Sequence, residues 1–177
     1  LVLSFFAVMA ILVLAGTLGV WTLATFAALP RALQVMRVFR TPKPAEQGIA
    51  EMMVDLYRTF AEPLTPETLF GWHRWLLSGR VDIPEIGTFR TDSEPMQIVS
   101  GSLTAPRVHF EAPPSPAVPE EMARFLQWFA DTGPNGSAPL PALTRAGLAH
   151  LYFESIHPFA DGNGRIGRAI AEKSLAQ

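Results

Sequence analysis

The sequence predicts a mainly α-helical fold, a helical bundle with one β-hairpin, preceded by a transmembrane helix. Three observations predict this fold class. Residues 1–30 contain no charged residue, apolar side chains recur at helical spacing through most of residues 45–177, and residues 80–112 lose that spacing. A chain of 177 residues has room for one domain with a sizeable core.

The composition argues against some partners and sites. The formal net charge is -2 and the isoelectric point is about 6.1, so no nucleic-acid partner is expected. The absence of cysteine excludes disulfides and thiolate metal sites. The chain begins at a leucine and stops inside a predicted helix, so we interpret it as a fragment or a truncated gene product.

The apolar segment at residues 1–30 is longer than the roughly 20 residues that a helix needs to cross a bilayer core. Basic residues follow at once, and by the positive-inside rule they hold the C-terminal side in the cytoplasm. We therefore expect a membrane anchor with the domain in the cytoplasm. The alternatives are a signal peptide, a buried helical hairpin or a misassigned gene start, and without an anchor the protein would be cytoplasmic.

Residues 31–44 are predicted to form a basic, proline-containing linker, and residues 45–177 the domain, with its core at about 64–177. The first helix is expected at 45–60. Its apolar stripe comprises Ile49, Met52, Met53, Leu56 and Phe60.

The second helix is expected to begin after Thr65, which suits an N-cap, with Pro66 at its first position. Gly79 is a plausible stop signal for this helix. The predicted buried side comprises Leu69, Trp72, His73, Leu76 and Leu77. His73 is interpreted as a packed or surface histidine, because no metal-ligand spacing surrounds it.

Residues 80–112 are predicted to contain extended pieces at 87–90, 96–101 and 107–110, with turns at 100–102 and 105–106. This pattern predicts a surface hairpin. A proline-rich connector at 113–119 follows, and further helices are expected at 120–131, 140–155 and about 163–177. The 140–155 helix is expected to carry Leu143, Gly147, Leu148, Leu151 and Tyr152.

Residues 157–168, His-Pro-Phe-Ala-Asp-Gly-Asn-Gly-Arg-Ile-Gly-Arg, concentrate groups suited to phosphate chemistry. His157 can accept a proton near pH 7, and Asp161 offers hard oxygen ligands to a divalent cation. Gly162 and Gly164 allow a sharp turn whose N–H groups face an anion. Phe159 is expected to point into the core and fix the loop.

A helix that begins near Asn163 would add a favourable dipole for phosphate. Arg165 and Arg168 lie three residues apart, so they are neighbours on that helix, and their guanidinium groups suit phosphate oxygens.

This stretch resembles the signature of the Fic family, H-P-F-x-[D/E]-G-N-G-R-x-x-R, and every specified position matches. The resemblance covers about residues 45–177. It implies a protein adenylyltransferase that transfers AMP from ATP onto a Ser, Thr or Tyr hydroxyl of a protein substrate. His157 would be the base and Asp161 the Mg²⁺ ligand. The nucleotide-binding residues would be Gly162, Asn163, Gly164, Arg165 and Arg168.

The resemblance also assigns the hairpin as a flap that holds a target segment by strand addition. The flap residues would be Met96, Gln97, Ile98 and Val99. Some members of the family transfer UMP, phosphate or phosphocholine instead, and a membrane-tethered, catalytically idle nucleotide-binding module is a further alternative. A homo-oligomer is compatible with the sequence.

Many members of the family carry an inhibitory [S/T]-x-x-x-E-[G/N] motif, whose glutamate pairs with the last arginine of the signature. Glu46, Glu51, Glu62 and Glu67 each lack a Ser or Thr four positions earlier. We therefore expect that the chain is not self-inhibited and that Arg168 is free to bind ATP. The candidate internal blockers are Glu46 and Glu51.

Overall fold

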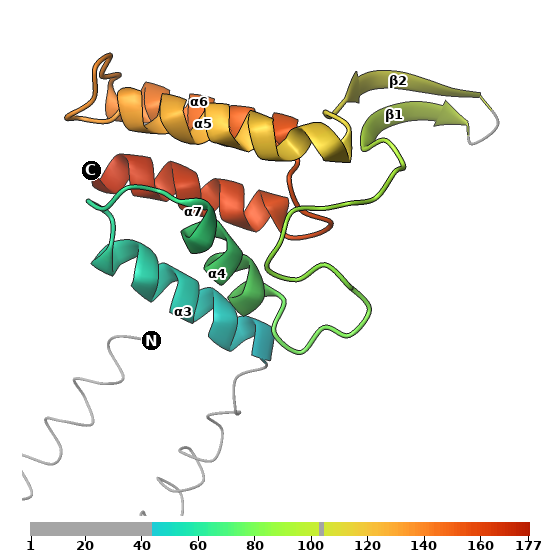
Figure 1. Ribbon diagram of the computed structural model, residues 1–177, viewed down its shortest axis with the longest axis horizontal. Helices are drawn as coiled ribbons and strands as arrows, with labels where there is room; N and C mark the ends of the chain where they lie inside the picture. The colour runs from blue at the N-terminus through green and yellow to red at the C-terminus, as the bar shows by residue number, and fades with distance from the viewer. Residues whose placement is uncertain (1–43, 103–104) are drawn as a thin grey trace, which may run out of the picture. The chain divides into compact units, whose positions relative to one another are not determined.

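The computed structural model describes residues 44–102 and 105–177 (Figure 1). The predicted membrane anchor and nearly all of the linker lie outside these residues. Within the described residues, no helix combines the length and the apolar character needed to cross a membrane.

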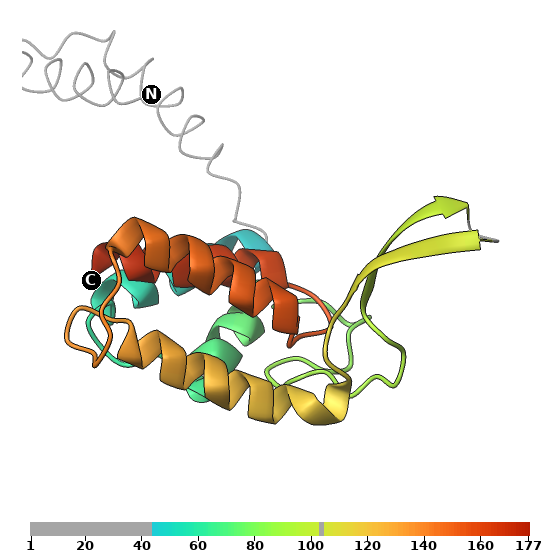
Figure 2. The same ribbon diagram turned by 90° about the horizontal axis from the view of Figure 1, so that it is seen from above.

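The described chain is mainly helical, as predicted, with one antiparallel hairpin. Its elements, in order, are α3 (Pro44–Arg58), α4 (Pro66–Leu76), β1 (Gln97–Ser102), β2 (Ala105–Glu111), a 3₁₀ turn (Ser115–Ala117), α5 (Val118–Asp131), α6 (Ala142–Ile156) and α7 (Asn163–Ala176). Helix α7 packs against α6 on one side and against α3 and α4 on the other, and α5 packs on α6. The hairpin projects from one end of this bundle in both ribbon views (Figures 1 and 2).

The core lies between the helices and joins apolar side chains from all of them. Its fully buried large members include Leu56, Leu69, Trp72, Met122, Phe125, Phe153, Phe159, Ile166 and Ile170. Aromatic rings of α5, α6 and the signature meet in this core, because Phe153 lies 5.8 Å from Phe125 and 6.3 Å from Phe159 between ring centroids. The core therefore reaches directly to the base of the signature loop.

Helix α3 buries a narrower face than its apolar pattern predicts. Met52 and Leu56 are buried, whereas Ile49 and Phe60 are 40% and 37% exposed. The reason is a close approach at Gly48, where an added Cβ would lie 1.8 Å from the backbone oxygen of Trp75 in α4. Positions 48, 52 and 56 share one face of the helix, so this approach turns Ile49 toward solvent.

This approach gives a prediction about stability. Gly48→Ala should destabilise the protein by more than about 2 kcal/mol, because α3 and α4 must separate to admit the methyl group. Gly147→Ala is the matched control, because Gly147 is an exposed residue of α6 with no atom near its added Cβ. This control should stabilise the protein by about 0.5–1 kcal/mol through helix propensity. Urea unfolding measures both, and equal midpoints for the two variants would contradict the prediction.

Helix α4 begins as predicted. The Thr65 side chain accepts a hydrogen bond from the backbone N–H of Thr68, and Pro66 occupies the first turn. The predicted buried residues of this helix are all buried. The helix ends at Leu76, three residues before Gly79, which adopts a φ of 82° in the following turn.

Three of the leucines expected on α6 do not belong to its buried face, whereas Tyr152 packs against the core. Leu143, Leu148 and Leu151 are 78%, 44% and 64% exposed. The buried residues are instead Arg145, Ala146, Ala149, Phe153 and Ile156. The buried face of α6 thus combines the small Ala146 and Ala149 with the large Phe153 and Ile156, which join the core.

The hairpin is confirmed, but its turns lie elsewhere. Ser100, Gly101 and Ser102 pair with Arg107, Pro106 and Ala105, so the segments predicted as turns belong to the strands. The register shifts between Ile98 and Val99, which places a bulge in the ribbon. Residues 87–90 do not form a strand.

Candidate active site

The signature begins where α6 ends. His157 is the C-cap of α6 and adopts the left-handed conformation, with φ 50° and ψ 58°. Among the described residues it is the only non-glycine residue with a positive φ. This conformation, on the order of 1–3 kcal/mol above the usual ones, turns the chain out of the helix, and Pro158 prevents its continuation. The turn leaves the His157 side chain 33% exposed at the helix end.

A buried arginine holds this turn in place. Arg90 is 2% exposed, and its guanidinium donates from Nε to the His157 carbonyl oxygen at 2.7 Å. Its other nitrogens donate to Ser115 Oγ at 2.6 Å and to the Pro113 carbonyl oxygen at 2.5 Å. The Arg90 backbone N–H donates to the Pro158 carbonyl oxygen at 2.9 Å. Burial lowers the pKa of the Arg90 guanidinium, and these oxygens compensate for its lost hydration.

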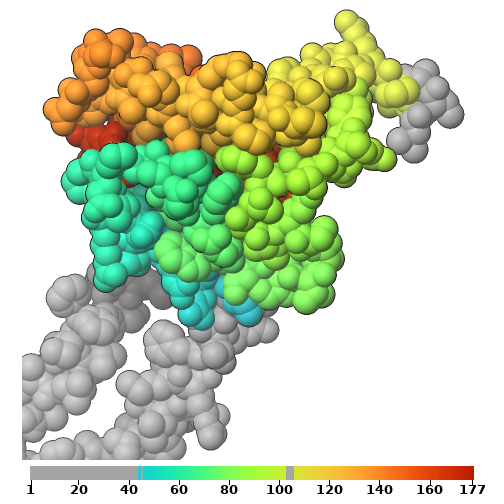
Figure 3. Space-filling model, viewed as in Figure 1, coloured from blue at the N-terminus to red at the C-terminus, as the bar shows by residue number. Residues whose placement is uncertain are grey.

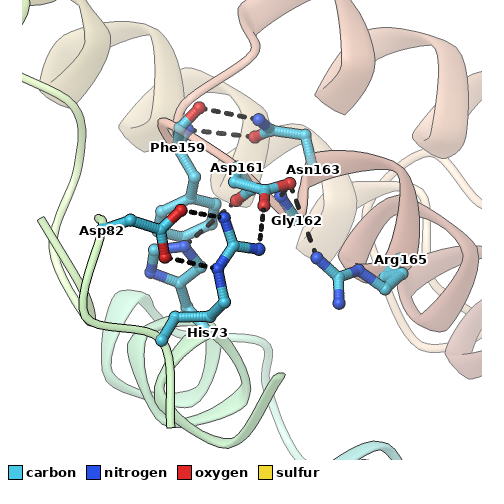
Figure 4. A network of polar contacts seen from close by, with 8 residues as sticks. His73, Asp82, Phe159, Asp161, Gly162, Asn163 and Arg165 are labelled. Atoms are coloured by element: carbon cyan, nitrogen blue, oxygen red, sulfur yellow. Dashed lines mark hydrogen bonds and ion pairs between the residues drawn. The ribbon is translucent and has the colours of Figure 1, made fainter. Parts of the chain in front are cut away.

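The signature loop closes on itself through Asn163. Its side-chain oxygen accepts from the Phe159 backbone N–H at 3.0 Å, and its Nδ2 donates to the Phe159 carbonyl oxygen at 2.7 Å (Figure 4). Asn163 is 2% exposed. The side chain thus shapes the loop, and its predicted contact with the α-phosphate stays a prediction.

His73 supports the loop from α4, as a packed histidine. Its ring stacks on Phe159 with 4.2 Å between centroids, and Phe159 is fully buried as predicted. The backbone N–H of Gly87 donates to His73 Nδ1 at 2.9 Å, so Nε2 is assigned as the donor to the Asp161 carbonyl oxygen at 3.1 Å. Burial lowers the pKa of His73, which favours this neutral form.

The carboxylate of Asp161 is half-exposed and lies at the end of the signature loop, just before α7 (Figure 4). Its Oδ1 accepts from the Gly162 backbone N–H at 2.6 Å and lies 3.5 Å from Arg165 Nη2. Its Oδ2 accepts from Arg80 at 3.2 Å, and Arg80 also pairs with Asp82 at 2.6 Å. The carboxylate is therefore surrounded by donors, with Arg80 and Arg165 on its two oxygens.

The start of α7 is suited to an anion. Helix α7 begins at Asn163 after Gly162, whose φ is 85°, and within the described residues no side chain caps this end. The N–H groups of a first helical turn have no acceptors in their own helix, and the dipole favours negative charge there. Arg168 is exposed, and no hydrogen bond or ion pair involves it in the part of the chain that the structure describes. That no inhibitory glutamate pairs with Arg168 stays a prediction.

A groove of about 590 Å³ lies between the hairpin and α6, next to the base. It is lined by Pro95, Met96, Gln97, Ile98, Phe110, Ala112, Leu151, Glu154, Ser155 and His157. Of the predicted flap residues, Met96, Gln97 and Ile98 line this groove, and Val99 lies beyond its lining. The space-filling view shows the hairpin standing clear of the bundle at this end (Figure 3).

The structure thus brings the predicted signature residues into one loop and helix start, and it adds supports that the sequence did not reveal. Arg80, Arg90 and the supporting role of His73 were not predicted.

Within the described ranges, no three His, Asp or Glu side chains form a cluster that could hold a metal. Asp161 alone fits the other common arrangement, in which Mg²⁺ takes one carboxylate together with the phosphates of a substrate.

Known proteins resemble this chain across most of its described length. Residues 63–175 match the sequence model of the Fic/DOC family. A probable protein adenylyltransferase of Aquifex aeolicus is 28% identical over 148 residues, which cover 84% of this chain and 40% of that protein. A protein adenylyltransferase of Caenorhabditis briggsae is 33% identical over 98 residues, which cover 55% of this chain and 16% of that protein.

Solved structures agree with this fold. A Fic family protein from Desulfovibrio desulfuricans has a TM-score of 0.53 at 32% identity, with 88% of this chain and 42% of that chain covered. A Fic domain containing signaling protein from Bacteroides thetaiotaomicron has a TM-score of 0.60 at 24% identity, with 75% and 46% covered, and supports the fold alone. The chain spans less than half the length of each of these four proteins.

Proposed function

This chain belongs to the Fic/DOC family, and from that membership we propose that it is a protein adenylyltransferase. It would transfer AMP from ATP to a Ser, Thr or Tyr hydroxyl of a target protein. The observation that carries the proposal is the juxtaposition of His157 with two sites. On one side lies the uncapped start of α7, and on the other the groove beside the hairpin. A base between an anion site and a peptide-sized groove suits group transfer from a nucleotide to a protein.

The reaction follows from these positions. The triphosphate would lie against the first turn of α7, with Arg165 and Arg168 beside its oxygens. His157 would take the proton of the target hydroxyl as its oxygen forms a bond to the α-phosphorus. The bond from that phosphorus to the bridging oxygen breaks, and its electron pair leaves with pyrophosphate. Positioning and electrostatic stabilisation supply most of the catalysis in such transfers.

Mg²⁺ is the implied cofactor, and the donor set of Asp161 fits it. Asp161 would hold the ion, whose positive charge would offset the negative charge that develops on the leaving group. Asp161 Oδ2 is engaged by Arg80 in the free protein, so this contact must open when a metal binds. Arg80 would then keep its ion pair with Asp82.

The target segment would enter the groove as an extended strand. A two-stranded ribbon leaves backbone N–H and C=O groups unpaired along its outer edges, which suits strand addition. Ile98 and Phe110 are 63% and 40% exposed beside the groove, so they can cover apolar side chains of the target. Such backbone pairing would hold the hydroxyl-bearing residue at His157.

Labelled ATP tests the proposed function. The chain incubated with protein acceptors should acquire label from ATP carrying ³²P at the α-phosphate, and none from ATP carrying it at the γ-phosphate. Label from the γ-position would instead indicate phosphate transfer. Label from a UTP or phosphocholine donor alone would change the donor, and nucleotide binding without any transfer would indicate an idle binding module.

Asp161→Asn gives a second prediction. The variant should lose the Mg²⁺-dependent part of ATP binding, about a ten-fold change in affinity, or roughly 1.4 kcal/mol. Calorimetric titration with ATP, with and without Mg²⁺, measures this difference. Asp82→Asn is the matched control, because it removes the other carboxylate partner of Arg80 and leaves Asp161 intact. A full Mg²⁺ effect in Asp161→Asn would leave this carboxylate only its contacts with the Gly162 N–H, Arg80 and Arg165.

A further inference from the structure

Close to the proposed base lies a carboxylate that forms no hydrogen bond with the described residues. Glu154 belongs to α6, one turn before His157, and its Oε1 is buried. Within the described residues no donor forms a hydrogen bond with this oxygen. Its neighbours are imidazoles: Glu154 Oε2 lies 4.0 Å from His157 Nδ1, and Oε1 lies 3.9 Å from His150 Nε2.

Glycines of α7 make the space for this carboxylate. A Cβ added to Gly167 would lie 2.7 Å from Glu154 Oε1, and one added to Gly164 would lie 3.9 Å from it. An alanine at position 167 would therefore displace the carboxylate. The Glu154 carboxylate thus packs closely between α6 and α7, next to the start of the signature loop.

Burying a carboxylate oxygen without a hydrogen-bond donor costs free energy, so the groups around it indicate its role. The charged or titratable groups near Glu154 are His150 of the same helix, His157 at its C-cap, and Arg168 of α7. Arg168 Nη1 lies 3.7 Å from a Cβ added at Gly164. The other residues that line the adjacent groove, including those of the hairpin, are uncharged. The ring nitrogen near the buried Oε1 belongs to His150, and the ring nitrogen near Oε2 belongs to His157, which carries the proposed chemistry.

We propose that Glu154 is a positioning residue for His157. Its carboxylate accepts a hydrogen bond from Nδ1–H, so Nε2 carries the lone pair that takes the proton of the target hydroxyl. As that proton arrives, the ring becomes an imidazolium, and the neighbouring carboxylate stabilises its charge. For this bond, the 4.0 Å between Oε2 and Nδ1 has to shorten to about 2.8 Å. This inference rests on the proposed role of His157 as the base.

The test uses nuclear magnetic resonance of the full chain labelled with ¹⁵N in histidine, with the His157 signals identified by their loss in His157→Asn. In the parent, the neutral ring of His157 should carry its proton on Nδ1. Glu154→Ala should shift the proton to Nε2, because the acceptor for Nδ1–H is gone. Glu154→Gln should keep it on Nδ1, because the amide oxygen still accepts.

Kinetics measures what Glu154 contributes to the chemical step. Both Glu154 variants should lower kcat for AMP transfer by about 10- to 100-fold, part of what a general base contributes. The Kd for ATP should stay within two-fold, because no phosphate contact is lost. Glu172→Gln is the control for the loss of a carboxylate, because Glu172 of α7 accepts from Tyr57 instead.

Two results would overturn the proposal. One is an unchanged His157 tautomer in Glu154→Ala. The other is tighter ATP binding with faster transfer in the Glu154 variants, which would make this carboxylate a competitor of the phosphates for Arg168. If the parent transfers no AMP, the proposed function fails, and the tautomer measurement still decides whether Glu154 orients His157.

Discussion

His157→Asn is expected to lower the rate of AMP transfer by about 10²–10⁴-fold, the usual contribution of a general base. Asparagine is chosen because it tolerates the left-handed conformation that His157 adopts, so the turn should survive. Affinity for ATP should stay within two-fold, since the proposed phosphate contacts come from α7. Initial rates with α-labelled ATP and calorimetric titration measure the two quantities.

The melting temperature of His157→Asn separates loss of the base from loss of the fold. An unchanged melting temperature with intact ATP binding makes the rate a direct measure of the base. Transfer at the parent rate would show that another group takes the proton, and the assignment of His157 would then be wrong.

The helices could be predicted because their apolar spacing and end signals are local. The cap at Thr65 and the start of α7 at Asn163 are both confirmed. The buried face of α6 could not be predicted from hydrophobicity alone. Its leucines are among its most apolar residues, yet Ala146, Ala149, Phe153 and Ile156 take the interior, because the buried face is set by which side of the helix meets the rest of the fold.

The signature residues could be predicted because they form one contiguous stretch. Their supports could not, since each comes from a distant segment. His73 and Arg90 lie 88 and 67 residues from their partners Asp161 and His157. An arginine that bonds backbone carbonyl groups has no local sequence pattern, and only the tertiary fold shows which carbonyls need a donor.

Arg90 joins three parts of the site. Its guanidinium bonds the end of α6 at His157 and the segment that follows the hairpin, at Pro113 and Ser115. Ser115 Oγ in turn donates to the Asp92 carbonyl oxygen at 2.5 Å, on the segment that enters the hairpin. The base and both ends of the hairpin are thus held by one buried side chain.

Arg90→Met should therefore destabilise the protein by about 3–5 kcal/mol, because it leaves buried carbonyl oxygens without a donor. Methionine has a similar length and keeps the apolar contacts of the arginine stem. Arg124→Met is the matched control, since the Arg124 side chain is 54% exposed and, in the described part of the chain, pairs only with glutamates of its own helix. Its unfolding midpoint should therefore barely move. Urea unfolding measures both variants. An Arg90→Met midpoint equal to that of the control would mean that water or a rearranged backbone satisfies these carbonyls, and that the turn at His157 is held by the αL conformation and Pro158 alone.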